Sequence, residues 1–153
     1  MPSYGTNTGL TAYLAASGRT LPVGADADVV RFWGTLYVDQ FAQCYRGSPL
    51  TTDNTFPRDL WPVVPANVEY ATYEAAFAYA SGVAIFGGGG TAGGQVIREK
   101  VDVLEVAYAA PQDGTGYWEN NMFILPAAYA MLLPFMKRKG GFFPSAMVVP
   151  ACG

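Results

Sequence analysis

The spacing of hydrophobic residues along the chain predicts several helices. The clearest helix covers residues 26–45, where apolar side chains recur every three or four positions: Val29, Phe32, Trp33, Leu36, Tyr37, Phe41 and Cys44. A second helix covers residues 65–81, with one face made of Val68, Ala71, Thr72, Ala75, Ala76 and Tyr79. Shorter helices are predicted at residues 10–17 and about 121–133. Because most aromatic residues follow this helical spacing, we expect them to pack in the core.

Residues that favour helix ends flank these segments. Asp26 and Asp28 lie in the first turn of the long helix, where the helix dipole favours anions. Pro65 suits the first turn of the next helix. Residues 48–64 contain three prolines and no helical pattern, which predicts a loop. We expect three apolar side chains to hold this loop against the core: Phe56, Leu60 and Trp61.

The segment 96–109 carries the only convincing β pattern. Its β-branched residues alternate with charged residues, and the alternation changes parity near Asp102. This predicts a hairpin with strands at about 96–101 and 104–109, preceded by a glycine-rich loop at 87–94. A lone two-stranded hairpin is marginal in water, so we expect this one to contact a neighbouring subunit. The contact residues would be Val96, Ile97, Arg98, Glu99, Lys100, Val101, Leu104, Glu105, Val106 and Tyr108.

The composition favours self-association. Only 14% of the 153 residues are charged, against about 25% in ordinary domains, and 51% are hydrophobic. So few charges cannot cover the surface of a small soluble monomer, so we expect part of that surface to be buried against copies or partners. The length suggests one domain, residues 1–136, followed by an extended C-terminal tail, residues 137–153.

The residues offer little for catalysis. The chain has no histidine, which removes the commonest general base and metal ligand. Cys44 and Cys152 are far apart in sequence, so they predict no zinc cluster and no disulfide framework. Helix capping and strand faces explain the carboxylate pairs Asp26/Asp28 and Glu99/Glu105 better than acid–base chemistry does. We expect no enzyme, no cofactor and no metal.

Nucleotide and membrane sites are also not expected. Gly88, Gly90 and Gly93 match the spacing GxGxxG, but they lead into a strand rather than opening a helix. The first five residues lack the pattern of a signal peptide. The uncharged stretches 75–97 and 122–136 are interrupted by polar residues or too short to span a membrane.

The C-terminal region contains two candidate contact segments. Lys137, Arg138 and Lys139 either touch phosphate or form a solvated helix end. The net charge of −3 and the isoelectric point of 4.7 count against a free-standing nucleic-acid binder. The uncharged tail either docks on a partner by strand addition or groove binding, or packs on its own core. Its docking residues would be Phe142, Phe143, Met147, Val148 and Val149.

Several motifs, in this order, resemble a known family. They are the loop with Phe56-Pro57-Arg58 and Trp61-Pro62, then VPANVEYATYEAAFAYA (64–80), VIREKVDVLEVAYA (96–109) and FILPAAYAMLLPFM (123–136). Together they resemble the head–tail adaptor, or head-completion, proteins of tailed bacteriophages. One branch of that family is described as DnaT-like single-stranded-DNA-binding proteins. The resemblance covers about residues 3–136.

The resemblance implies a mainly α fold, a small bundle of about four helices with a protruding β-hairpin. It also implies a homo-oligomeric ring, typically of about twelve copies, that docks beneath the portal protein in the virion neck. Such a ring extends the DNA channel, contacts genomic DNA transiently and provides a platform for a neck or tail-completion protein. The alternative function is single-stranded-DNA binding during phage replication.

Overall fold

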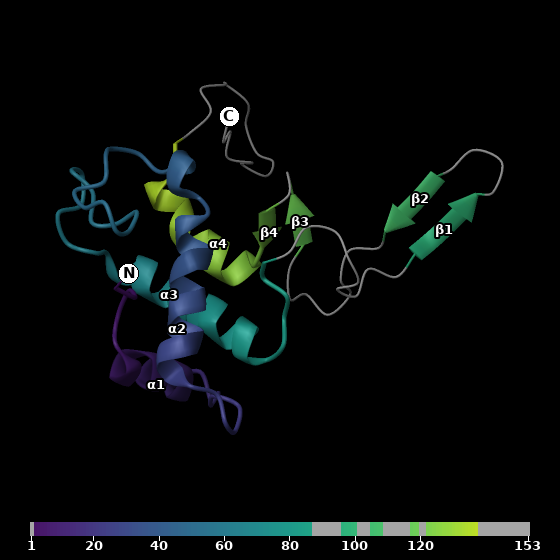
Figure 1. Ribbon diagram of the computed structural model, residues 1–153, viewed down its shortest axis with the longest axis horizontal. Helices are drawn as coiled ribbons and strands as arrows, with labels where there is room; N and C mark the ends of the chain where they lie inside the picture. Colours follow the sequence, from purple (N-terminus) through teal and green to yellow (C-terminus); the bar gives the residue numbers. More distant parts are fainter. Residues whose placement is uncertain (1, 87–95, 101–104, 109–116, 120–121, 138–153) are drawn as a thin grey trace.

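A computed structural model describes residues 2–86, 96–100, 105–108, 117–119 and 122–137. Its four α-helices form a small bundle, which confirms the expected mainly α fold (Figure 1). They are α1 (Asn7–Ala16), α2 (Ala27–Asp39), α3 (Ala66–Ala80) and α4 (Pro126–Leu132), with 3-10 helices at Ala42–Cys44 and Leu133–Phe135. Two antiparallel pairs are described as well: β1 (Val96–Lys100) with β2 (Glu105–Tyr108), and β3 (Tyr117–Glu119) with β4 (Met122–Ile124).

The crossing of α2 over α3 organises the bundle (Figure 1). Gly34 makes this crossing close, because a Cβ atom at this position would overlap the carbonyl oxygen of Thr72 and lie 3.1 Å from the Ala76 nitrogen. The buried side of α2 contains Val30, Gly34, Thr35, Tyr37 and Val38. Two helix backbones can approach this closely only where one of them lacks a side chain.

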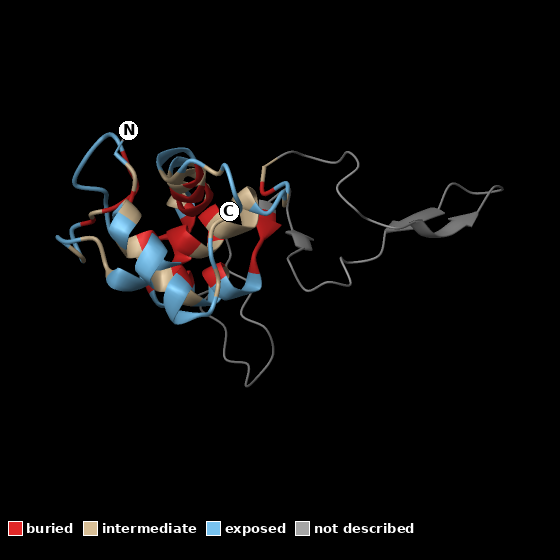
Figure 2. Ribbon diagram, turned by 90° about the horizontal axis from the view of Figure 1, so that it is seen from below, coloured by how far each residue is buried: buried red, intermediate tan, exposed pale blue. Residues whose placement is uncertain are grey.

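Aromatic side chains fill the main core between α2, α3 and α4. Tyr37, Phe41, Tyr45 and Phe56 are at most 1% exposed, and buried residues gather where the helices face one another (Figure 2). The backbone N–H of Leu125 donates to the Tyr37 hydroxyl at 2.8 Å, so the start of α4 is bonded to the centre of α2. Buried polar groups need such partners, and this bond satisfies both of them.

A second, smaller cluster joins α1 to the bundle. Leu10 and Leu14 of α1 pack against Val30, Tyr73 and Ala76. The α1 N-terminus is capped by Thr6, whose hydroxyl accepts the N–H of Gly9 at 2.9 Å.

An ion pair ties the end of α1 to α3. Arg19 donates to Glu74 at 2.9 Å, and the Tyr13 hydroxyl donates to the same carboxylate at 2.7 Å. Burial opposes ionisation of Glu74, but its hydrogen bonds from Arg19 and Tyr13 and the charge of Arg19 together lower its pKa. Burial, followed by the hydrogen bond to Glu74 and its charge, raises the pKa of Tyr13 to about 12.

This raised pKa predicts an alkaline loss of stability. The pKa of Tyr13 is higher in the folded chain than its usual value of 10.0, so its contribution is complete below pH 10 and is lost as pH rises towards about 12. The loss should be on the order of 1 kcal/mol, because solvent screens a half-buried phenol. Thermal melts from pH 8 to pH 12 should therefore fall more steeply for the native chain than for Tyr13→Phe. Parallel curves for the two proteins would contradict this assignment.

Three helix boundaries and one loop contact differ from the sequence predictions. The helix expected at 26–45 ends at Asp39, because the segment that follows bonds to the chain after α4: Arg46 N–H donates to the Phe135 carbonyl and Lys137 N–H to the Cys44 carbonyl. The helix expected from about 121 begins at Pro126, because Met122–Ile124 pairs as β4 and the residue before a proline avoids helical geometry. The helix expected at 10–17 begins earlier, at Asn7, because Thr6 provides the cap.

Leu60, expected to hold the loop on the core, is 55% exposed.

The prediction that the cysteines form no disulfide is wrong, since Cys44 is disulfide-bonded. Separation in sequence does not give separation in space. The chain just after α4 lies beside Cys44, because the Lys137 N–H donates to the Cys44 carbonyl. The partner cysteine lies outside the described residues.

Candidate interaction surfaces

One side of α2 presents an apolar stripe to solvent, which we call surface A: Val29, Phe32, Trp33 and Leu36. Val29 is 48% exposed and Phe32 37% exposed, while Trp33 and Leu36 are half-buried. Their spacing of three and four residues places them on one face of the helix. The expectation that helically spaced aromatics pack in the core is therefore right for Tyr37 and Phe41 but wrong for Phe32. Apolar residues lie on both sides of α2, and only one side faces the bundle.

Surface A continues onto the end of α3 through ring contacts. Trp33 stacks on Tyr79, with ring centroids 5.2 Å apart and planes at 24°. Its ring also lies 5.6 Å from Phe86 and 5.7 Å from Phe32. These contacts fix the orientation of Trp33 within surface A.

A second apolar region, which we call surface B, consists of Leu60, Trp61, Val63 and Leu133. Leu60 and Val63 are 55% and 79% exposed, and Leu133 is 37% exposed. Trp61 packs edge-on against the buried Phe135 at 5.0 Å. The guanidinium of Arg46 covers the Trp61 ring at 5.3 Å and donates to the Pro134 carbonyl at 2.7 Å, which joins the loop to the end of α4.

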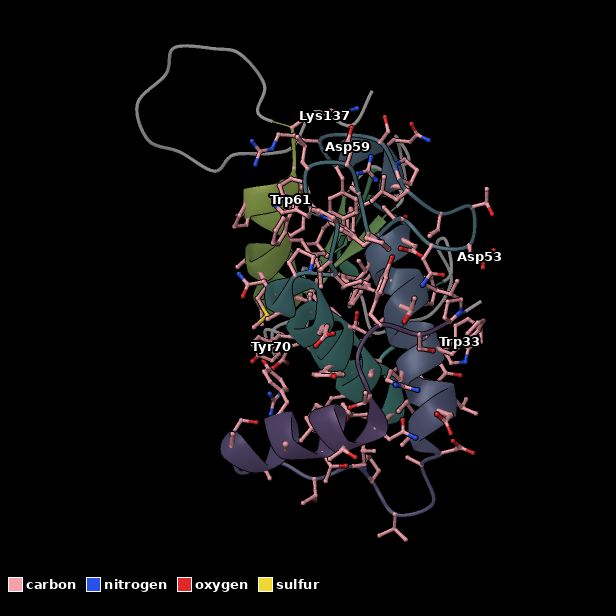
Figure 3. All side chains as sticks on the ribbon, turned by 90° about the vertical axis from the view of Figure 1, so that its left-hand side faces the viewer. Trp33, Asp53, Asp59, Trp61, Tyr70 and Lys137 are labelled. Carbon is pink, nitrogen blue, oxygen red and sulfur yellow. The ribbon has the colours of Figure 1, made fainter. Side chains whose placement is uncertain are left out.

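Surfaces A and B are separate regions of the molecule. Figure 3 shows Trp33 beside α2, on the right of the view, and Trp61 beside α4, towards the top. Asp59 and Lys137 lie at the same end as Trp61 in this view. A single small body thus carries two different apolar regions.

Arg58 fixes the loop that carries surface B. Its side chain is buried, and it donates to the carbonyls of Arg46 (2.8 Å), Thr55 (3.3 Å) and Gly47. The guanidinium also lies over the rings of Tyr45 and Phe56, 5.8 and 5.9 Å from their centroids. In the sequence, Arg58 is recognised only as part of the Phe56-Pro57-Arg58 motif. The available signal was a lone arginine between aromatic residues in a proline-rich loop.

Tyr4 connects the N-terminal segment to the same loop. Its hydroxyl donates to Asp39 at 2.6 Å and accepts the N–H of Phe56 at 2.9 Å, while its own N–H donates to Thr35. Burial raises the pKa of Asp39, although hydrogen bonds from Tyr4 and Thr55 oppose the shift. Asp39 also lines an open cleft of about 690 Å³ beside residues 49–55. The two residues that donate to its carboxylate, Tyr4 and Thr55, belong to the N-terminal segment and to the loop. Asp39 therefore holds the loop in place.

Each cation whose side chain the structure describes already has an acceptor within the protein. Arg19 binds Glu74, Arg31 binds Asp28 and the Gly5 carbonyl, and Arg46 and Arg58 bind backbone carbonyls. Lys137 donates to the Gln43 carbonyl at 2.9 Å. Phosphate would have to compete with carboxylates at Arg19 and Arg31, whereas Arg46, Arg58 and Lys137 are bonded to neutral carbonyls.

The other predicted site residues are described only in part. The backbones of 96–100 and 105–108 pair in the register Glu99↔Val106 and Lys100↔Glu105. Val101 and Leu104 lie outside the described residues, as do Arg138, Lys139 and the tail residues Phe142, Phe143, Met147, Val148 and Val149. In the part of the chain that the structure describes, no helix is long and apolar enough to cross a membrane. That part also contains no group of three residues suited to hold a metal ion.

Comparison with known families matches residues 1–148 to a family model described as "Putative DnaT-like ssDNA binding protein". The chain belongs to this DnaT-like family. The match includes α1 to α4 and the loop fixed by Arg58, so the membership concerns the whole bundle. No curated protein and no solved structure matches the chain.

Proposed function

We propose that this DnaT-like protein is a non-catalytic structural subunit that forms a homo-oligomeric ring and serves as a head–tail adaptor of a tailed bacteriophage. In this role the ring docks beneath the portal protein, continues the DNA channel and offers a platform to the next neck or tail protein. Assembly would take place in the host cytoplasm, and the mature protein would lie in the neck of the virion.

The observation that carries this proposal is the pair of exposed apolar surfaces on a body with few charges. Exposed single hydrophobic residues are common, but contiguous apolar regions built around tryptophan mark protein contacts. In surface A, ring contacts join Trp33 to Phe32 and Tyr79, and in surface B the exposed Leu60 and Val63 flank Trp61 in the chain. The ion pairs of Arg19 and Arg31 with carboxylates fit a scaffold better than a phosphate-binding surface. The motifs that resemble those of head–tail adaptors support this kind of scaffold.

Ring formation can be tested with the purified full-length chain. Light scattering after size exclusion, at micromolar concentrations, should give a mass of several copies, and negative-stain images should show closed rings. Portal-bearing particles incubated with the protein should retain it after sedimentation. A protein that stays monomeric at high concentration and does not associate with such particles would refute the adaptor function.

Two further segments belong to this proposal. The hairpin at 96–109, with the loop at 87–94, is expected to contact the neighbouring subunit, and Phe142–Val149 to dock on a portal or tail protein. Deleting 96–109 should leave a helical monomer, whereas truncation after Lys139 should preserve the ring and abolish particle joining. Rings that persist without the hairpin would remove it from the interface.

The second candidate function is single-stranded-DNA binding, and the family description is the observation that favours it. Since Arg19 and Arg31 are already in ion pairs, the cations to test for DNA contact include Arg98, Lys100, Arg138 and Lys139. Phosphate contacts make such binding strongly salt-dependent. A gel shift with a single-stranded oligonucleotide at physiological salt, weakened by replacing these four residues with alanine, would support this function. No shift at micromolar protein would exclude it.

A further inference from the structure

Surfaces A and B differ in the charges that border them. Asp26 and Asp28, both exposed, stand at the start of α2 next to Val29 of surface A. The nearby Arg31 is largely buried, with a side chain 14% exposed that already binds Asp28. The border of surface A thus consists of Asp26 and the Asp28–Arg31 ion pair, and its net charge is negative.

Surface B is bordered mainly by cations. Arg46, over the Trp61 ring, and Lys137, just after α4, are both exposed. Asp59 is nearby as well, and its carboxylate accepts the N–H groups of Ser48 (2.9 Å) and Leu60 (2.7 Å), so the border of surface B carries two cations and one carboxylate. The hydrogen bonds of Arg46 and Lys137 to carbonyls leave their positive charges uncompensated.

These charges decide among the ways in which two copies could meet. Contact between two A surfaces would bring carboxylates together, and contact between two B surfaces would bring cations together. Contact of A with B pairs opposite charges around two apolar centres, each anchored by a tryptophan. Because A and B are separate regions, with Trp33 and Trp61 apart in Figure 3, this contact leaves one free A and one free B on each pair of copies.

We infer that surface A of one copy docks on surface B of the next, and that this head-to-tail contact is the repeating interface of the ring. The inference rests on the proposed ring, since only an assembly of this chain supplies both surfaces. Head-to-tail contacts close into rings when the rotation between copies divides a full turn. The occupant of each surface is thus a second copy of this chain.

Paired lysine variants test this contact. Val29→Lys with Phe32→Lys disables surface A, and Leu60→Lys with Val63→Lys disables surface B. Lysine is used on both sides so that the two altered surfaces repel each other. All four positions are exposed, and circular dichroism with thermal melts checks that both proteins fold. Val29→Lys alone and Val63→Lys alone serve as milder variants.

Each double variant alone should be monomeric at concentrations where the native chain forms rings, with association weakened roughly 100-fold or more. Mixing the two should yield a 1:1 dimer, because one intact A and one intact B remain. Ala12→Lys with Ala16→Lys, on the exposed side of α1, is the matched control and should form rings.

Other outcomes would overturn the inference in distinguishable ways. A surface B variant that dimerises by itself would show contact between two A surfaces. Rings that persist in both variants would place the interface elsewhere while leaving the adaptor function intact. A native chain that is always monomeric would remove both proposals. Loss of oligonucleotide binding by the surface A variant alone, with unchanged assembly, would assign surface A to nucleic acid.

Discussion

Replacing Gly34 with alanine should destabilise the protein by about 2–4 kcal/mol, because the new methyl group would overlap the Thr72 carbonyl where α2 crosses α3. Alanine is the better helix former by about 1 kcal/mol, so replacing a glycine with alanine in an open part of a helix would stabilise the protein instead. The melting temperature should fall by roughly 10 °C. Differential scanning calorimetry gives both quantities.

Val29→Ala provides the control for Gly34→Ala. It lies in the same helix but on the exposed side, where its substitution should change stability by less than about 0.5 kcal/mol. If Gly34→Ala melts at or above the native temperature, α2 and α3 are not in close contact at this point.

Replacing Arg58 with alanine should cost about 3 kcal/mol and loosen the loop that carries surface B. The substitution leaves the carbonyls of Arg46, Gly47 and Thr55 without their donor, and charged hydrogen bonds of this kind are the strong ones. Urea denaturation measures the loss of stability. Limited proteolysis should show faster cleavage between residues 48 and 58, since that segment loses its anchor.

Two substitutions separate the role of Arg58 from that of positive charge in general. Arg58→Lys keeps the charge but loses the planar fork, so it should recover little of the stability. Arg46→Ala removes an exposed arginine with one described hydrogen bond and should cost less than about 1 kcal/mol. Full stability in Arg58→Lys would show that the charge alone holds the loop.

Local patterns in the sequence predicted where the helices are better than where they end. The helix expected at 65–81 is found at Ala66–Ala80, because its end signals, Pro65 and Gly82, act locally. The end of α2 could not be predicted from local signals. Its apolar spacing continues to Cys44, but tertiary hydrogen bonds from Arg46 and Lys137 turn the chain after Asp39.

The candidate surfaces were harder to predict than the fold. Helix α2 contains pairs of adjacent apolar residues, such as Val29 with Val30 and Phe32 with Trp33. The local sequence does not indicate which residue of each pair faces the bundle. Gly34 decides this orientation, because only the side of α2 that carries it can approach α3 closely. The anchoring role of Arg58 could not be predicted, because its acceptors are backbone carbonyls. Every residue has such a carbonyl, so the sequence does not show which ones bind Arg58.

The hydrogen bond between Tyr37 and Leu125 has a consequence for synthesis on the ribosome. The two residues are 88 positions apart, so the centre of α2 has no α4 to cover it until most of the chain has been translated. The nascent protein must therefore carry Tyr37 and its aromatic neighbours uncovered for several seconds at ordinary elongation rates. Chaperone dependence during expression should therefore be sensitive to changes in α4.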